Sequence, residues 1–139
     1  MIENCKKSHI YVEGFDGGII SNNTFFFPSY TTQNNTKEYN IYIDYCNWTI
    51  ITDNNLFESG YESILLKHSQ SVRVANNNIA WSGQRIQLPS IHIMDFDVSG
   101  NQRFNSNALI GNNIVFGSGN GIKCENVGRI ICNSNTNFP

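Results

Sequence analysis

The chain has 139 residues, the length of a single domain, and a net charge of −2. This charge does not favour binding to the phosphate backbone of a nucleic acid, which would require a basic surface. No apolar run approaches the roughly 20 residues of a membrane span, so we expect no membrane insertion. Hydrophobic residues make up 40% of the chain and are regularly spaced, which favours an ordered core beneath a polar surface over disorder.

An apolar pair with one residue between its members recurs along the chain. The pairs are Ile10/Val12, Ile41/Ile43, Ile64/Leu66, Ile91/Ile93 and Ile122/Cys124. Alternation with a period of two residues predicts short strands, and nowhere is helical spacing sustained. The uninterrupted unit is 22 to 23 residues long, with insertions at 27–39, 84–89 and 96–107. Glycine and serine mark the expected corners, where glycine tolerates a positive φ.

An asparagine-rich motif follows each apolar pair. We take one asparagine of each motif as an anchor, which gives Asn23, Asn55, Asn78, Asn113 and Asn135. Self-similarity at this period predicts a solenoid, here a right-handed parallel β-helix of about five to six turns. Stacked at about 4.8 Å per turn, these amides would form a ladder of hydrogen bonds along one corner. Three residues later an aromatic column is expected at Phe26, Trp81, Phe116 and Phe138, which Glu58 interrupts.

Two stretches, 55–66 and 113–124, resemble the repeat of the right-handed parallel β-helix superfamily. This superfamily includes pectate lyases, polygalacturonases and the tailspike depolymerases of bacteriophages, and the resemblance covers nearly the whole chain. It implies a carbohydrate-active β-helix, most like a tailspike segment. The paired aspartates of polygalacturonases and the Asp-His signature of pectate lyases have no counterpart, so catalytic residues are not transferred from the family.

The four cysteines, Cys5, Cys46, Cys124 and Cys132, are not spaced like metal ligands. Cys124 and Cys132 fall at predicted strand positions, where we expect them to be small buried hydrophobic residues. We expect neither a metal nor a cofactor. The chain begins inside a repeat, so we expect a single β-helix segment of a longer protein, which would assemble as a homotrimer or associate end to end through uncapped coils.

Side chains between the inward-facing residues would form two columns on the outer face of the solenoid. The first column is Tyr11, Tyr42, Leu65, His92 and Lys123; the second is Glu13, Asp44, Lys67, Met94 and Glu125. Glu13 and Asp44 would lie one turn apart, near the roughly 5 to 5.5 Å that a retaining glycosidase needs. One carboxyl could then act as the acid and the other as nucleophile or base. For an elimination reaction, His92 or Tyr42 would be the base.

Substrate binding is assigned to Tyr11 and Tyr42, whose rings could stack on sugars, and to Lys67 and Arg103, which could pair with an acidic sugar. The insertions at 27–39 and 96–107 would be walls of the groove. Further candidates are Glu58 as a buried acid, Arg85, and the pair Asp95 and Asp97 in a loop. The alternative interpretation of the outer columns is a solvated charge ladder without any chemistry.

Two functions remain open from the sequence. The first is a β-helix of the phage tailspike type, on a virion tail or an extracellular surface, that binds a bacterial surface polysaccharide and, if it is an enzyme, cleaves it as a hydrolase or lyase. The second is a non-catalytic spacer in a virion fibre or surface adhesin. The position of the insertions separates them, because loops that border one groove favour a sugar-binding protein.

Overall fold

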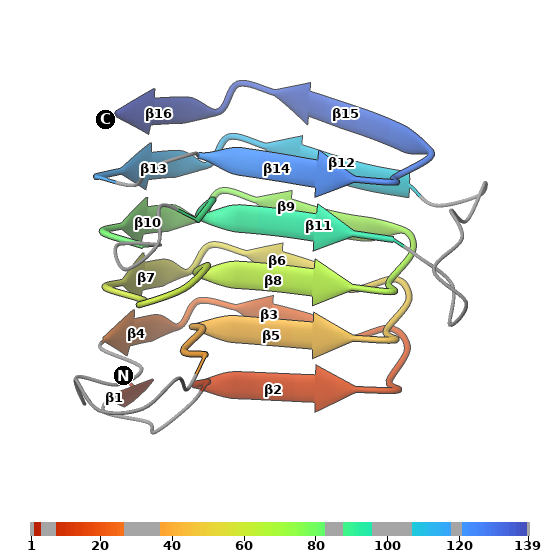
Figure 1. Ribbon diagram of the computed structural model, residues 1–139, viewed down its shortest axis with the longest axis horizontal. Helices are drawn as coiled ribbons and strands as arrows, with labels where there is room; N and C mark the ends of the chain where they lie inside the picture. The colour runs from red at the N-terminus through yellow and green to blue at the C-terminus, as the bar shows by residue number, and fades with distance from the viewer. Residues whose placement is uncertain are drawn as a thin grey trace.

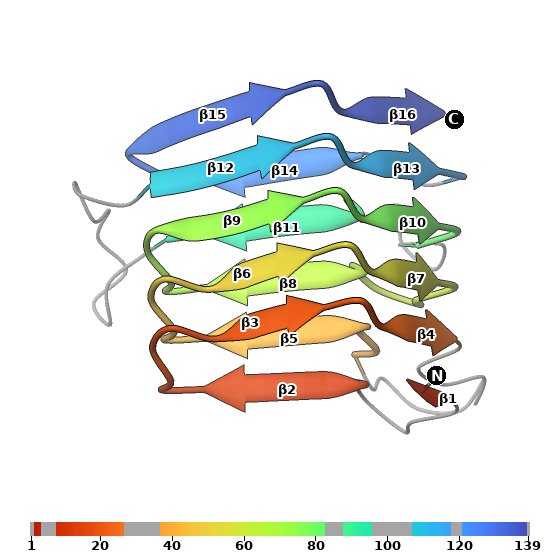
Figure 2. The same ribbon diagram turned by 180° about the vertical axis from the view of Figure 1, so that it is seen from behind.

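The computed structural model describes residues 2–3 (backbone only), 8–26, 37–82, 88–95, 107–117 and 121–138. Their strands form three parallel sheets that wrap around one axis, so that each coil contributes one strand to each sheet (Figures 1 and 2). The described residues contain no helix of any kind. The predicted parallel β-helix is therefore confirmed.

The sheets are numbered in the order in which a coil visits them. The first sheet consists of β2 (Ile10–Glu13), β5 (Ile41–Asp44), β8 (Ile64–Lys67), β11 (Ile91–Met94) and β14 (Ile122–Glu125). The second consists of β3 (Ile19–Ser21), β6 (Ile50–Thr52), β9 (Val72–Ala75), β12 (Asn107–Gly111) and β15 (Arg129–Asn133). The third consists of β1 (Ile2–Glu3), β4 (Thr24–Phe26), β7 (Asn55–Phe57), β10 (Asn78–Ala80), β13 (Ile114–Phe116) and β16 (Thr136–Phe138).

The core lies inside the coils and is built from aliphatic columns. In the first sheet Ile43, Leu66 and Ile93 stack in register and are almost completely buried. In the third sheet Leu56 and Ile79 do the same. Because side chains alternate along a strand, a slip of one residue would turn a whole column toward solvent. The apolar alternation therefore fixes the register of the first sheet.

An asparagine ladder, buried at its three central members, runs along the corner between the second and third sheets. Its members are Asn23, Asn54, Asn77, Asn113 and Asn135, and each side-chain Nδ2 donates to the Oδ1 of the next at 2.9 to 3.2 Å. The ladder was predicted, but two of its members were wrong: Asn55 and Asn78 begin strands of the third sheet and are exposed. The residue before each rung has a positive φ, which Asn and Asp tolerate well, and in runs such as 76–78 the asparagine that turns the corner comes first.

The aromatic column was also displaced by one residue in two coils. Phe26, Phe57, Ala80, Phe116 and Phe138 are in register along the third sheet. Phe26 and Phe57 stack with their ring centroids 4.7 Å apart. The interruption is therefore Ala80 rather than Glu58, and Trp81 packs its edge against Phe116. The same one-residue difference as in the ladder accounts for both corrections.

The cysteines behave only partly as predicted. Cys124 is half-buried, and burial raises the pKa of its thiol to about 11. Cys132 lies on β15, whose residues are all exposed, so its predicted burial is wrong. Cys46 is fully enclosed at a corner of the first sheet, where its Sγ donates to the carbonyl of Asp44 at 3.2 Å.

The corner after β13 depends on Gly117. This glycine has a φ of +63°, and a Cβ placed there would lie 2.6 Å from Cδ1 of Trp81. We expect Gly117→Ala to lower the free energy of unfolding by about 2 to 3 kcal/mol, because it combines backbone strain with displacement of the indole. Gly14→Ala is the matched control: its φ is +68° with nothing within 4 Å, so only about 1 to 2 kcal/mol should be lost. Equal losses in urea unfolding would contradict the role of Trp81.

Candidate functional site

The two predicted outer columns exist in the first sheet. Pairing between its strands aligns Tyr11, Tyr42, Leu65, His92 and Lys123 in one column and Glu13, Asp44, Lys67, Met94 and Glu125 in the other. Glu13 and Asp44 are therefore on neighbouring strands at the same position, as expected. The two columns point away from the core because their neighbours in each strand, such as Ile43 and Leu66, point into it.

These columns form the floor of a cavity of about 920 Å³, called the trough below. Tyr11, Tyr42, Leu65, Lys67 and Met94 contribute floor residues from β2, β5, β8 and β11. With about 4.8 Å between strands, the floor extends about 14 Å along the axis of the solenoid. The remaining lining residues precede the strands and form a wall: Ser8, Lys37, Tyr39, Tyr61, Glu62 and Leu88.

Four tyrosines give the trough an aromatic surface. The rings of Tyr11 and Tyr42 stack almost parallel, 5.1 Å apart with an angle of 12° between their planes. The ring centroid of Tyr39 lies 5.2 Å from that of Tyr42 and 5.8 Å from that of Tyr61. Burial, and next the charge of Glu62, raise the pKa of Tyr39; burial, and next the hydrogen bond to Asp44, raise that of Tyr42. The phenols of Tyr39 and Tyr42 therefore stay neutral and can donate hydrogen bonds.

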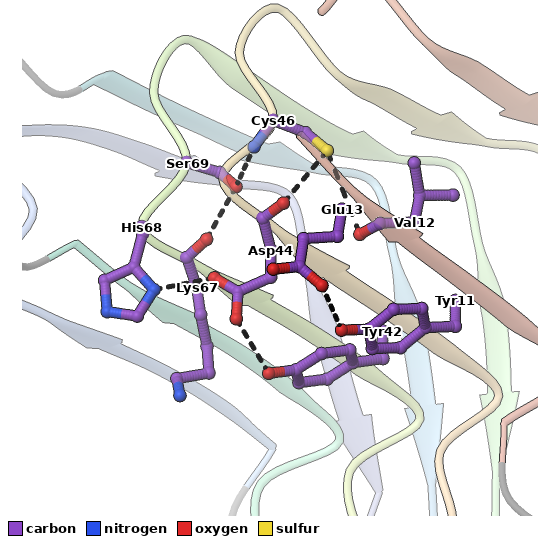
Figure 3. Close-up of polar contacts among 9 residues, drawn as sticks. All are labelled: Tyr11, Val12, Glu13, Tyr42, Asp44, Cys46, Lys67, His68 and Ser69. Carbon is purple, nitrogen blue, oxygen red and sulfur yellow. Dashed lines mark hydrogen bonds and ion pairs between the residues drawn. The ribbon is translucent and has the colours of Figure 1, made fainter. Parts of the chain in front are cut away.

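Asp44 is the centre of a polar cluster at one edge of the trough (Figure 3). Its Oδ2 accepts a hydrogen bond of 2.9 Å from Tyr42 Oη, and its Oδ1 lies 2.6 Å from Nδ1 of His68. On the neighbouring strand Tyr11 Oη donates to Glu13 at 2.6 Å. Tyr45 stacks on the His68 ring at 4.4 Å and so holds the imidazole in place. Each carboxylate oxygen of Asp44 therefore has a partner, and the residue is only 8% exposed.

A second cluster surrounds His92 on β11. Nδ1 of His92 lies 2.9 Å from Oε1 of Glu62, and Nε2 lies 3.4 Å from Oε2 of Glu125. Glu125 also pairs with Lys123, and mainly this contact lowers the pKa of Glu125. His92 was expected to be exposed, but only 7% of it is accessible, and Glu62 and Glu125 lie beside its ring. It contacts Glu62 and Glu125 rather than the pair Glu13 and Asp44.

The other predicted residues divide into three groups. Tyr11, Tyr42 and Lys67 line the trough, as their proposed role in binding requires. Arg103, together with Arg85 and Asp97, lies outside the described residues. Glu58 is half-buried at a corner with a φ of +54°, and Asp95 is buried directly after β11. Lys37, Tyr39 and Leu88 place the ends of the first and second insertions beside the trough; the third lies outside the described residues except for Asn107.

Sequence reasoning missed Tyr39, Tyr61, Glu62 and His68. A usable signal was present, because Ser8, Tyr39 and Glu62 all stand two residues before a strand of the first sheet. Extending the repeat alignment upstream of the apolar pairs would have placed them in one column along the wall. A second signal lies after the strands. Tyr45 and His68 each directly follow a strand of the first sheet and occupy equivalent corner positions with a positive φ.

The described residues contain no group of three or more His, Cys, Asp or Glu side chains arranged to hold a metal ion. Within the same residues, no helix is long and apolar enough to cross a membrane. The chain is a parallel β-helix with an aromatic, carboxylate-bearing trough on one outer sheet. In comparisons with known proteins, no family model, no curated protein and no solved structure matches it.

Proposed function

We propose that this β-helix binds a polysaccharide in the trough. The observation that carries the proposal is the stack of Tyr11 and Tyr42 on the floor, with the hydroxyl of each ring bonded to a carboxylate beside it. Sugars have apolar ring faces and hydroxyl-bearing edges, so they match a surface that alternates aromatic rings with hydrogen-bonding groups. An elongated trough along four strands fits a chain of sugars better than a small compact ligand.

In its specific form, the proposal is a tailspike-type protein that recognises a bacterial surface polysaccharide. It would function on a virion tail or an extracellular surface, as part of a homotrimer or a longer parent chain. The support is the resemblance of the repeat to β-helix proteins that act on carbohydrates. A spacer of a virion fibre or adhesin, the competing proposal, has no use for a lined cavity.

Cleavage of the bound polysaccharide is a second candidate function, favoured by the contact of 2.6 Å between Asp44 and His68. A carboxylate that is hydrogen-bonded to an imidazole can move a proton to or from a substrate within reach. Asp44 with its neighbour Glu13, and His92 in its own cluster, remain the predicted catalytic residues. The expected signs are new reducing ends for a hydrolase and unsaturated uronates for a lyase.

The binding function is tested with Tyr42→Ala. We expect this variant to bind a recognised oligosaccharide about 10-fold more weakly in titration calorimetry, because the central ring of the floor is lost. Tyr42→Phe keeps the ring but loses the hydrogen bond to Asp44. Its affinity for the oligosaccharide should lie between the affinities of Tyr42→Ala and the native protein. The control is Phe116→Ala, which removes an exposed ring from the third sheet. Equal binding by Tyr42→Ala and native protein, or no binding to any glycan tried, would overturn the proposal.

A further inference from the structure

Glu62 has an unusual environment for a carboxylate. It stands two residues before β8 in the wall of the trough and is only 5% exposed. Its Oε1 is held by Nδ1 of His92 at 2.9 Å. Its Oε2 is enclosed, yet among the described residues it has no hydrogen-bond partner. A buried carboxylate oxygen without a donor is costly, and native proteins satisfy such groups with a ligand or an ordered water.

Glu62 lines the trough, so a ligand bound there can supply the donor that its unpaired oxygen lacks. Tyr39 and Tyr61 line the trough beside it, and the charge of Glu62 contributes to the raised pKa of Tyr39 after the larger effect of burial. On the other side, His92 fixes Oε1, and Nε2 of its ring lies 3.4 Å from Oε2 of Glu125. The carboxylate cannot turn its free oxygen to His92 without breaking the bond that already exists.

We propose that Glu62 is the specificity-determining residue of the trough, and that it accepts a hydrogen bond from a hydroxyl group of a neutral sugar. The inference rests on the proposed polysaccharide-binding function and specifies its substrate class. A uronic acid placed against Glu62 would bring two carboxylates together in a site with little water, which is unfavourable. Lys37 is exposed and Lys67 half-buried, so water screens their attraction for an acidic sugar more than the repulsion at Glu62.

The test compares two sets of probes by titration calorimetry with the whole chain. The neutral set contains oligosaccharides of glucose, xylose and mannose, and the acidic set contains oligogalacturonates and oligoalginates. We expect the native protein to prefer a neutral probe. Glu62→Gln should weaken binding of that probe about 10-fold to 100-fold, because it loses a charge-assisted hydrogen bond. The same substitution should strengthen binding of the acidic probes, because the repulsion disappears.

Asp53→Asn is the matched charge control. Asp53 is exposed on the asparagine corner with a φ of +57°, and asparagines occupy the same position in neighbouring coils as Asn22 and Asn76. The substitution Asp53→Asn removes the same charge without backbone strain, so the affinities for the neutral and the acidic probes should both stay unchanged. If Glu62→Gln does not fold, as judged by circular dichroism, Glu62→Asp provides the answer: it keeps the charge, withdraws the oxygen by one methylene group, and should weaken neutral binding.

His92 is a positioning residue in this arrangement, and the ratio of neutral to acidic affinity tests it. His92→Asn can still donate to Oε1 of Glu62 and should keep the ratio, whereas His92→Leu should reduce it. If the native protein binds neutral probes and Glu62→Gln binds them equally well, only the role of Glu62 is refuted. A native preference for acidic probes refutes it too. Failure of every probe to bind refutes both this inference and the proposed function.

Discussion

Replacing Asn77 with alanine is expected to lower the free energy of unfolding by about 3 to 5 kcal/mol. Asn77 is 1% exposed and occupies the centre of the ladder. Its Nδ2 contacts the carbonyls of Ile51 and Ala75 and Oδ1 of Asn113, each at 3.0 Å. Its Oδ1 accepts from both nitrogens of Asn54. Alanine would leave these buried donors and acceptors unsatisfied, and each unsatisfied group costs about 1 to 3 kcal/mol.

Asn78→Ala is the control for this prediction, because it changes the adjacent asparagine on the exposed side. The side chain of Asn78 makes a single long contact of 3.4 Å to Asn55. We expect a change within about 0.5 kcal/mol. Denaturant unfolding followed by circular dichroism measures both variants. A similar loss of stability in the two would show that the ladder does not hold this corner together.

The second large effect concerns two adjacent leucines on β8. Leu66 is fully buried between Ile43 and Ile93 inside the coils. We expect Leu66→Ala to lower the free energy of unfolding by about 3 to 5 kcal/mol, because the closed core cannot collapse around the missing atoms. Leu65 is only 4% exposed, yet it is part of the floor of the trough. Leu65→Ala should cost only about 1 kcal/mol, because water in the trough can fill the space.

The same pair distinguishes the core from the binding surface. Leu66→Ala should leave the affinity for an oligosaccharide unchanged at temperatures below the melting temperature of the variant. Leu65→Ala should alter this affinity, because the floor loses the side chain that lies between Tyr42 and His92. The measurements are thermal unfolding by calorimetry and titration with the probe that the native protein prefers. Equal stability of the two variants would contradict the assignment of inside and outside on β8.

Local pattern explains why so much of the fold could be predicted. Pairs such as Ile41/Ile43 and Ile64/Leu66 alternate with a period of two, and their spacing of 23 residues is one coil of the solenoid. A slip of one residue would expose an apolar column, and aligning the two apolar pairs with each other pairs Tyr42 with Leu65 and Asp44 with Lys67, as the structure shows. The ladder was harder to place, because in a run of three asparagines only backbone φ decides which amide points inward.

The sequence by itself therefore determined the solenoid, its strands and the two outer columns that form the floor of the trough. Only the tertiary structure decided the wall and the partners of the charged groups. Tyr39, Tyr61 and Glu62 precede strands in segments without a repeating apolar pattern, and the path of each segment depends on its packing against the neighbouring coil. The contacts of Asp44 with His68 and of Glu62 with His92 join residues 24 and 30 positions apart. Such pairs form because stacking places coils side by side, and periodicity alone does not specify which side chains then meet.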